Sequence, residues 1–132
     1  LKNIKFVIMG VDFGYQKQMY DLINELEIET SIHIIRNPVR ADVISAYQEC
    51  EFLILPSRWE LSPLVPLEGF AFKKTIISTD TDGIPYTVKN NINGLLFQQE
   101  NFEELSNFGF KSTLTKNELR QSYQNFSKKY VL

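Results

Sequence analysis

Short apolar runs, separated by polar loops and by stretches with helical periodicity, recur along the chain. Two of these runs, residues 52–55 and 75–78, are continuous enough to be typical of strands buried on both faces of a parallel sheet. The predicted strands are residues 4–9, 31–35, 52–55, 75–78 and 95–97. Helical stretches lie between them and no β-hairpin is visible. The pattern therefore predicts an α/β fold, a Rossmann-like three-layer αβα arrangement with a parallel sheet.

Helices are predicted wherever apolar positions repeat every three or four residues. These stretches are residues 15–28, residues 39–50 and a helix from Pro63 that carries Leu64, Leu67 and Ala71 toward the core. Ser62 is expected to cap that helix, with Pro63 as its first residue, where a missing N–H costs no hydrogen bond. A short helix opens at Ile84-Pro85, and capping-box spacings at residues 101–104 and 115–118 start helices in the tail.

The stretch from Phe52 to Leu96 holds the candidate chemistry, because it combines a buried strand, a polar loop and a helix start. In parallel α/β sheets, ligands bind at the carboxyl ends of the strands, over helix N-termini whose N–H groups and dipole favour anions. Pro66 has no N–H, so the donors at this helix start are chiefly Leu64 and Val65. We therefore predict a phosphate site at these two amides.

Two glutamates flank this helix start, Glu60 just before it and Glu68 about one and a half turns into the helix. Carboxylates repel phosphate, but they accept hydrogen bonds from the hydroxyls of a sugar or a ribose. A diphosphate between a sugar and a nucleoside fits that layout. The alternative is that both glutamates are solvated surface charges.

The segment PSRWELSPLVPLEGFA, with Glu60 and Glu68 separated by seven residues, resembles the E-x7-E motif of retaining glycosyltransferases of the GT-B architecture, family 4, or glycosyl transferases group 1. The segments KKTIISTDTDGIP and NINGLLF are similar to that family's "GKPVIATDVGGIPE…NGLL" run. The resemblance covers roughly residues 4 to 110, and it is specific in order, spacing and flanking residues.

The resemblance implies that residues 1–132 are the C-terminal, nucleotide-sugar-binding domain of such an enzyme, without the first βα segment and the acceptor domain. It implies transfer of a sugar to an acceptor hydroxyl with retention, by a chain that is inactive alone. Glu60 and Glu68 would act in catalysis, Glu60 holding the donor sugar and Glu68 the ribose hydroxyls. The N–H groups of Leu64 and Val65 would receive the diphosphate.

The resemblance implies further donor-site residues, by their positions in the family's sequence pattern. Gly83 lies in the family's glycine turn, Asn37 follows the strand whose loop holds the nucleobase, and Gly10 or Gly14 lies near the donor. Taken by themselves, Gly10 and Gly14 lack the full G-x-G-x-x-G spacing, which favours ordinary turn glycines. The partners implied are the nucleotide-sugar and the protein's own N-terminal domain, through which peripheral membrane association is possible. The acceptor is not identified.

The sequence departs from the family pattern at three positions: Leu61 and Asp82 stand where glycine is usual, and Tyr86 where glutamate is usual. Asp80-Thr81-Asp82 also resembles a D-x-D metal motif, but that motif belongs to a different glycosyltransferase architecture. We therefore expect no metal and no cofactor besides the donor. Two other functions stay open: a sugar-nucleotide epimerase or hydrolase of the same architecture, and a non-catalytic interaction module.

The composition of the chain excludes several other classes of protein. With 132 residues and 43% hydrophobic residues, the chain suffices for one ordinary globular domain. A formal net charge of -2 is not the positive charge expected of a nucleic-acid-binding protein, and no apolar run is long enough to span a membrane. Cys50 and His33 are each the only residue of their type, which argues against a disulfide framework, a zinc site and a Ser-His-Asp triad. A lone cysteine suits a reducing compartment, so we expect a cytoplasmic protein.

Overall fold

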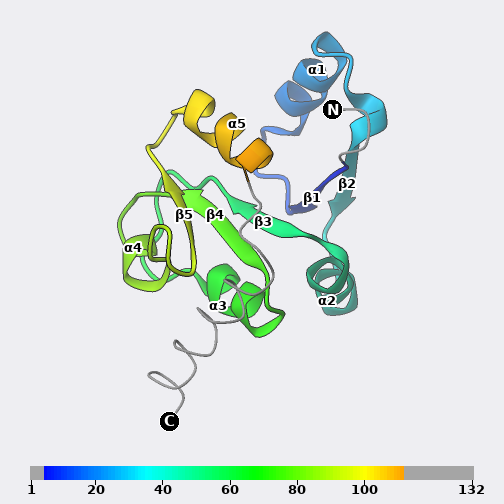
Figure 1. Ribbon diagram of the computed structural model, residues 1–132. Coiled ribbons are helices and arrows are strands. Elements are labelled where there is room, and N and C mark those ends of the chain that lie inside the picture. The colour runs from blue at the N-terminus through cyan, green and yellow to red at the C-terminus, as the bar shows by residue number, and fades with distance from the viewer. Residues whose placement is uncertain (1–4, 112–132) are drawn as a thin grey trace. The chain divides into compact units, whose positions relative to one another are not determined.

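The computed structural model describes residues 5–111 and contains all five predicted strands, each parallel to its neighbour (Figure 1). The strands are β1 (Phe6–Gly10), β2 (Ile32–Arg36), β3 (Phe52–Leu55), β4 (Thr75–Thr79) and β5 (Gly94–Phe97). The helices are α1 (Gln16–Glu25), the 3-10 turn η1 (Glu29–Ser31), α2 (Arg40–Glu49), α3 (Leu64–Ala71), α4 (Ile84–Thr87) and α5 (Phe102–Lys111). The capping box expected at residues 115–118 lies outside the described residues.

The chain groups into two compact units, which divide between Glu49 and Cys50. The first unit contains a two-stranded sheet of β1 and β2, and the second contains a three-stranded sheet in the order β3-β4-β5. Alternating helices and parallel strands make this a Rossmann-like α/β fold, as predicted.

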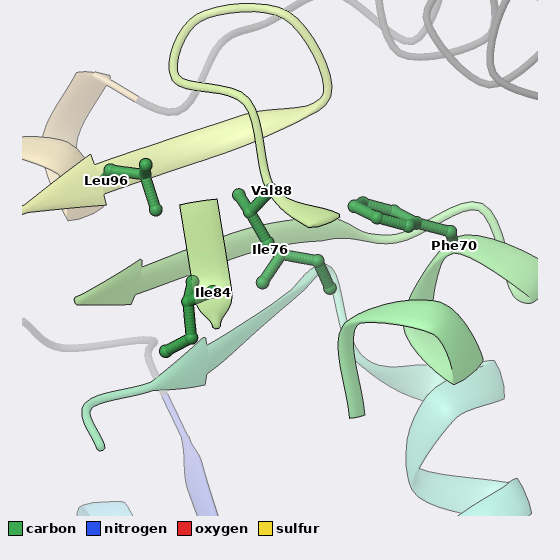
Figure 2. Close-up of a cluster of buried hydrophobic side chains, with 5 residues drawn as sticks. All are labelled: Phe70, Ile76, Ile84, Val88 and Leu96. Carbon is green, nitrogen blue, oxygen red and sulfur yellow. The ribbon is translucent and has the colours of Figure 1, made fainter. Parts of the chain in front are cut away.

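The second unit is a three-layer sandwich around β4, in which every residue is buried. One face of its sheet packs against α3 and α4 through a cluster of Phe70, Ile76, Ile84, Val88 and Leu96 (Figure 2). The other face packs against α5 through Ile77, Leu95 and Phe97, together with Leu105 and Phe108. Figure 1 shows α5 on the opposite side of the sheet from α3 and α4. Residues of alternating parity supply the two clusters, as the pleat of a strand requires.

The first unit is packed more thinly. Among its described residues only two hydrophobic side chains, Ile23 and Tyr47, are buried. The burial on both faces that was expected for residues 52–55 and 75–78 holds for β4, whereas every residue of the edge strand β3 is half-buried. In β1, Phe6, Val7 and Ile8 are exposed. Strand β1 has one neighbouring strand in its sheet, so it lacks the central position that buries β4.

Helix α3 buries a different face from the one predicted. Pro66, Gly69 and Phe70 are its buried residues, whereas Leu64 is 66% exposed, Leu67 is 44% exposed, and Ala71 is exposed as well. The helix presses closely onto the sheet at Gly69, where an added Cβ would lie 2.5 Å from Leu53 and 2.6 Å from Ile76. That close approach fixes the rotation of the helix and turns its leucines outward.

The start of α3 also differs from the prediction. Pro63 is the N-cap with extended backbone (φ -68°, ψ 127°), and no side chain caps the helix. Ser62 therefore lies one residue too early to cap, and the first helical residue is Leu64 instead of Pro63. The capping prediction at residues 101–104 is confirmed in part, because Asn101 Oδ1 accepts a hydrogen bond from the Glu104 N–H at 3.0 Å.

The carboxyl end of α3 is a Schellman motif with lysine at the position where glycine is usual. The Lys73 N–H donates to the Phe70 carbonyl and the Lys74 N–H to the Gly69 carbonyl, both at 2.9 Å. Lys73 adopts φ 59°, the left-handed region that disfavours residues with a Cβ. In the similar family run "GKPVI", glycine occupies the equivalent place.

Replacing Lys73 with glycine is expected to stabilise the protein by about 1 kcal/mol, because the left-handed penalty of a residue with a Cβ disappears. The measurement is the free energy of unfolding in urea. Lys73→Ala is the matched control, since it removes the same side chain and keeps the Cβ, and it should give no such gain. Equal stabilities for the two variants would contradict the explanation.

Candidate functional site

The loop after β3 carries Glu60, and its backbone is held by groups from the end of β4 and from the loops after β4 and β5. The Thr79 hydroxyl donates to the Ser57 carbonyl at 2.6 Å, and the Gln99 side-chain amide donates to the Arg58 carbonyl at 3.1 Å. The Gly83 N–H donates to the Glu60 carbonyl at 2.8 Å. Arg58 also forms an exposed ion pair with Glu100 at 3.0 Å. Since three loops at the carboxyl ends of β3, β4 and β5 are joined in this way, the backbone of Glu60 has a defined position.

Gly83 fits its place because only a residue without a side chain can lie there. A Cβ on Gly83 would be 1.8 Å from the Leu61 carbonyl oxygen and 2.9 Å from that of Glu60. Its φ is -76°, so close backbone approach, not a left-handed conformation, requires glycine here. Asp82 just before it has φ 43°, which explains why glycine is usual at that position in the similar family run. Within the described residues, Gly83 supports the loop of Glu60.

Both predicted glutamates are half-buried. Glu60 lies on the loop that leads into α3, and its Oε1 accepts a hydrogen bond from the Ser57 hydroxyl at 3.2 Å. Glu68 lies in the second turn of α3, about 6 Å along the axis from Leu64. One loop and one helix of the second unit therefore carry both carboxylates, one before and one after the helix start.

The first turn of α3 is open. Leu64 and Val65 are both exposed, and in the described part of the chain no acceptor takes the N–H of either residue. Pro66 in the same turn has no N–H, as the sequence requires. Two adjacent amides at the positive end of a helix dipole can bind an anion. The structure thus places Glu60, Leu64, Val65, Glu68 and Gly83 in one unit around this helix start.

Three other predicted residues, Gly10, Gly14 and Asn37, lie in the first unit. Gly10 ends β1, and its carbonyl accepts a hydrogen bond from the Asn37 N–H at 3.0 Å, so these two residues come together. Asn37 has φ 48°, a conformation that asparagine tolerates better than most residues. Gly14 has φ 103° and belongs to the turn before α1.

The turn at Gly14 is closed by Asp12, a residue that the sequence analysis missed. Asp12 Oδ1 accepts hydrogen bonds from the N–H groups of Gly14 at 2.7 Å, and of Tyr15 and Gln16 at 3.1 Å each. A carboxylate thereby occupies the amides that a phosphate would use at this helix start. An aspartate a few residues before a helical stretch is a capping signal, and this one could have been found. The geometry favours the interpretation of Gly14 as a turn glycine.

The remaining candidates carry little chemistry. Burial raises the pKa of the Cys50 thiol, an effect that the nearby Lys74 ammonium opposes, so Cys50 is a weak nucleophile. Asp80 accepts a long hydrogen bond from Gln98 at 3.5 Å. Among the described residues there is no group of three or more His, Cys, Asp or Glu side chains that could hold a metal ion. No helix in residues 5–111 has the length and apolar character needed to cross a membrane.

Solved structures of low sequence identity share this fold. The chain superimposes on Anabaena HepE in complex with UDP-glucose with a TM-score of 0.83, at 20% identity, over 97% of this chain and 37% of that one. The sucrose-phosphate synthase of Thermosynechococcus elongatus gives a TM-score of 0.78 at 18% identity, over 90% of this chain and 31% of that one. These likenesses confirm the fold class.

Sequence comparisons identify the family. The chain is 33% identical over 104 residues to an uncharacterized glycosyltransferase of Haemophilus influenzae, covering 78% of this chain and 28% of that protein. It is 28% identical over 134 residues to one of Methanocaldococcus jannaschii, covering 93% of this chain and 38% of that protein. It therefore spans well under half the length of these relatives. The family model for glycosyl transferases group 1 matches residues 1–130, and the chain belongs to that family.

Proposed function

We propose that this chain is the C-terminal, donor-binding domain of a retaining family-4 glycosyltransferase, which transfers a sugar from a nucleotide-diphosphate sugar to an acceptor hydroxyl. The observation that carries the proposal is the open first turn of α3, with two amides that have no acceptor in the described residues and a half-buried glutamate on each side in sequence. Membership of the glycosyl transferases group 1 family supports it. A structural neighbour that was crystallised with UDP and with UDP-glucose supports a nucleotide-sugar donor.

On this proposal, different residues bind different parts of the nucleotide-sugar donor. The N–H groups of Leu64 and Val65 receive the diphosphate, and the helix dipole stabilises the charge that develops on the leaving group. Glu68 accepts hydrogen bonds from the ribose hydroxyls, and Glu60 accepts them from the donor sugar. The diphosphate then needs no obligatory metal ion. The proposal also includes that the acceptor is held by the protein's own N-terminal domain and that residues 1–132 alone are inactive.

Glu68→Ala in the full-length protein is expected to weaken nucleotide binding about tenfold to hundredfold, the effect of losing one or two hydrogen bonds to a charged group. Isothermal titration calorimetry with UDP, GDP and ADP gives the affinity, and the strongest-binding nucleotide is used for the comparison. Glu25→Ala, at an exposed glutamate in the last turn of α1, is the matched control and should bind like the wild type. An unchanged affinity in Glu68→Ala would remove the ribose role.

A further inference from the structure

The Ser57–Glu60 turn is held at both ends by its backbone. At one end the buried hydroxyl of Thr79, which is 2% exposed, donates to the Ser57 carbonyl at 2.6 Å. At the other end the Gly83 N–H donates to the Glu60 carbonyl at 2.8 Å, and the Gly83 Cα lies against the Leu61 carbonyl. These contacts fix where the side chain of Glu60 leaves the backbone. They do not fix its three rotatable side-chain bonds.

The Ser57 hydroxyl supplies the missing constraint. It donates to Glu60 Oε1 at 3.2 Å, and both residues are half-buried. A serine three residues before the glutamate is close enough to reach the carboxylate, and a hydrogen bond to a charged oxygen is stronger than one between neutral groups. Among the side chains that the structure describes, none is hydrogen-bonded to the second oxygen, Oε2. The carboxylate is thus held by one oxygen and can offer the other to a ligand.

We infer that Ser57 is a positioning residue, which orients the Glu60 carboxylate toward the donor sugar. The inference rests on the proposed function of Glu60. A carboxylate that is already oriented loses less rotational freedom when the sugar binds, and it stays aligned as the reaction proceeds. Removing the Ser57 hydroxyl should therefore lower turnover through Glu60, without loosening the fold.

The local structure separates this role from a purely structural one. The contact that anchors Ser57 in the fold uses its backbone carbonyl, which every amino acid has. Ser57→Ala keeps that carbonyl and removes only the hydroxyl that contacts Glu60. Ser57→Thr keeps a hydroxyl on the same carbon. Ser62→Ala is a matched control in the same loop, because Ser62 is exposed and no described residue is hydrogen-bonded to its side chain.

The test measures kcat and KM of the full-length protein with UDP-glucose, GDP-mannose and ADP-glucose, and it continues with the donor that is turned over fastest. Ser57→Ala should lower kcat about tenfold, with little change in UDP, GDP or ADP affinity and in Tm. Ser57→Thr should recover most of the loss, and Ser62→Ala should match the wild type. In a Glu60→Ala background, Ser57→Ala should cause no further loss of kcat, because Ser57 acts on the donor sugar only through the Glu60 carboxylate.

The outcomes distinguish the positioning role of Ser57 from the proposed function of Glu60, on which it rests. If Glu60→Ala impairs turnover while Ser57→Ala does not, the positioning role is wrong and the function of Glu60 stands. A full additional loss in the Glu60→Ala background, or a loss in Ser57→Ala that Ser57→Thr fails to restore, also overturns the positioning role. If Glu60→Ala has wild-type activity, the proposed role of Glu60 fails and the inference fails with it.

Discussion

Gly83→Ala should destabilise the protein by about 3 kcal/mol, the cost of forcing an atom into a site that has no room for it. The new Cβ would lie 1.8 Å from the Leu61 carbonyl oxygen, less than any real contact allows. The clash is with backbone, so no rotamer change can relieve it, and the two loops must separate. Separation also breaks the hydrogen bond from the Gly83 N–H to the Glu60 carbonyl. We therefore expect the full-length variant to lose turnover as well as stability.

Gly10→Ala is the matched control for stability. A Cβ on Gly10 meets nothing within 4 Å, so the free energy of unfolding should stay within about 0.5 kcal/mol of the wild type. Urea denaturation gives the free energy of unfolding of both variants. The comparison shows what an added Cβ costs at a glycine without space around it, relative to a glycine with open space around it. A Gly83→Ala protein as stable as Gly10→Ala would show that the loops can move apart at no cost.

Ile76→Ala should cost about 3–4 kcal/mol of unfolding free energy, within the range of large-to-small substitutions in well-packed cores. Ile76 is 0% exposed in the middle of the central strand β4, and its Cδ1 lies 2.6 Å from the Cβ position that Gly69 would have on α3. Phe70, Val88 and Leu96 surround it in the same cluster. Because this packing comes at once from α3, from the end of α4 and from β5, the structure cannot easily collapse into the space left behind.

Ile92→Ala provides the comparison, since it deletes the same atoms from a side chain that is 64% exposed in the turn before β5. Its free energy of unfolding should change by less than about 0.5 kcal/mol. The midpoint of urea unfolding should fall strongly for Ile76→Ala and hardly at all for Ile92→Ala, with the same dependence on urea concentration in both. Similar losses in the two variants would mean that the core is not centred on β4.

The strands could be predicted from the sequence because an apolar run of four or five residues leaves few alternatives once loops and helical stretches bound it. The sequence could also predict that the free N–H groups at the start of α3 belong to Leu64 and Val65, because the neighbouring prolines have no N–H. Both predictions depend on local chemistry alone. That these two N–H groups bind a diphosphate stays a prediction.

The face that α3 buries could not be predicted in the same way. Leu64, Leu67 and Ala71 are apolar and repeat at helical spacing, so a pattern of apolar positions assigns them to the core. The close approach at Gly69 to Leu53 and Ile76 determines the rotation instead, and that contact joins residues far apart in the sequence. Likewise, the reason for glycine at position 83 lies in the backbone of Leu61, which no local pattern contains.

The link between Gly83 and Glu60 has a consequence for engineering. Chimeric enzymes are often made by joining segments of relatives, and a crossover between residues 61 and 83 would combine the loop of one parent with the glycine turn of another. The two segments meet through backbone atoms at van der Waals limits, so a small difference in the path of either parent would leave a gap or an overlap. Crossovers before residue 57 or after residue 83 keep both segments from one parent and are the better choice.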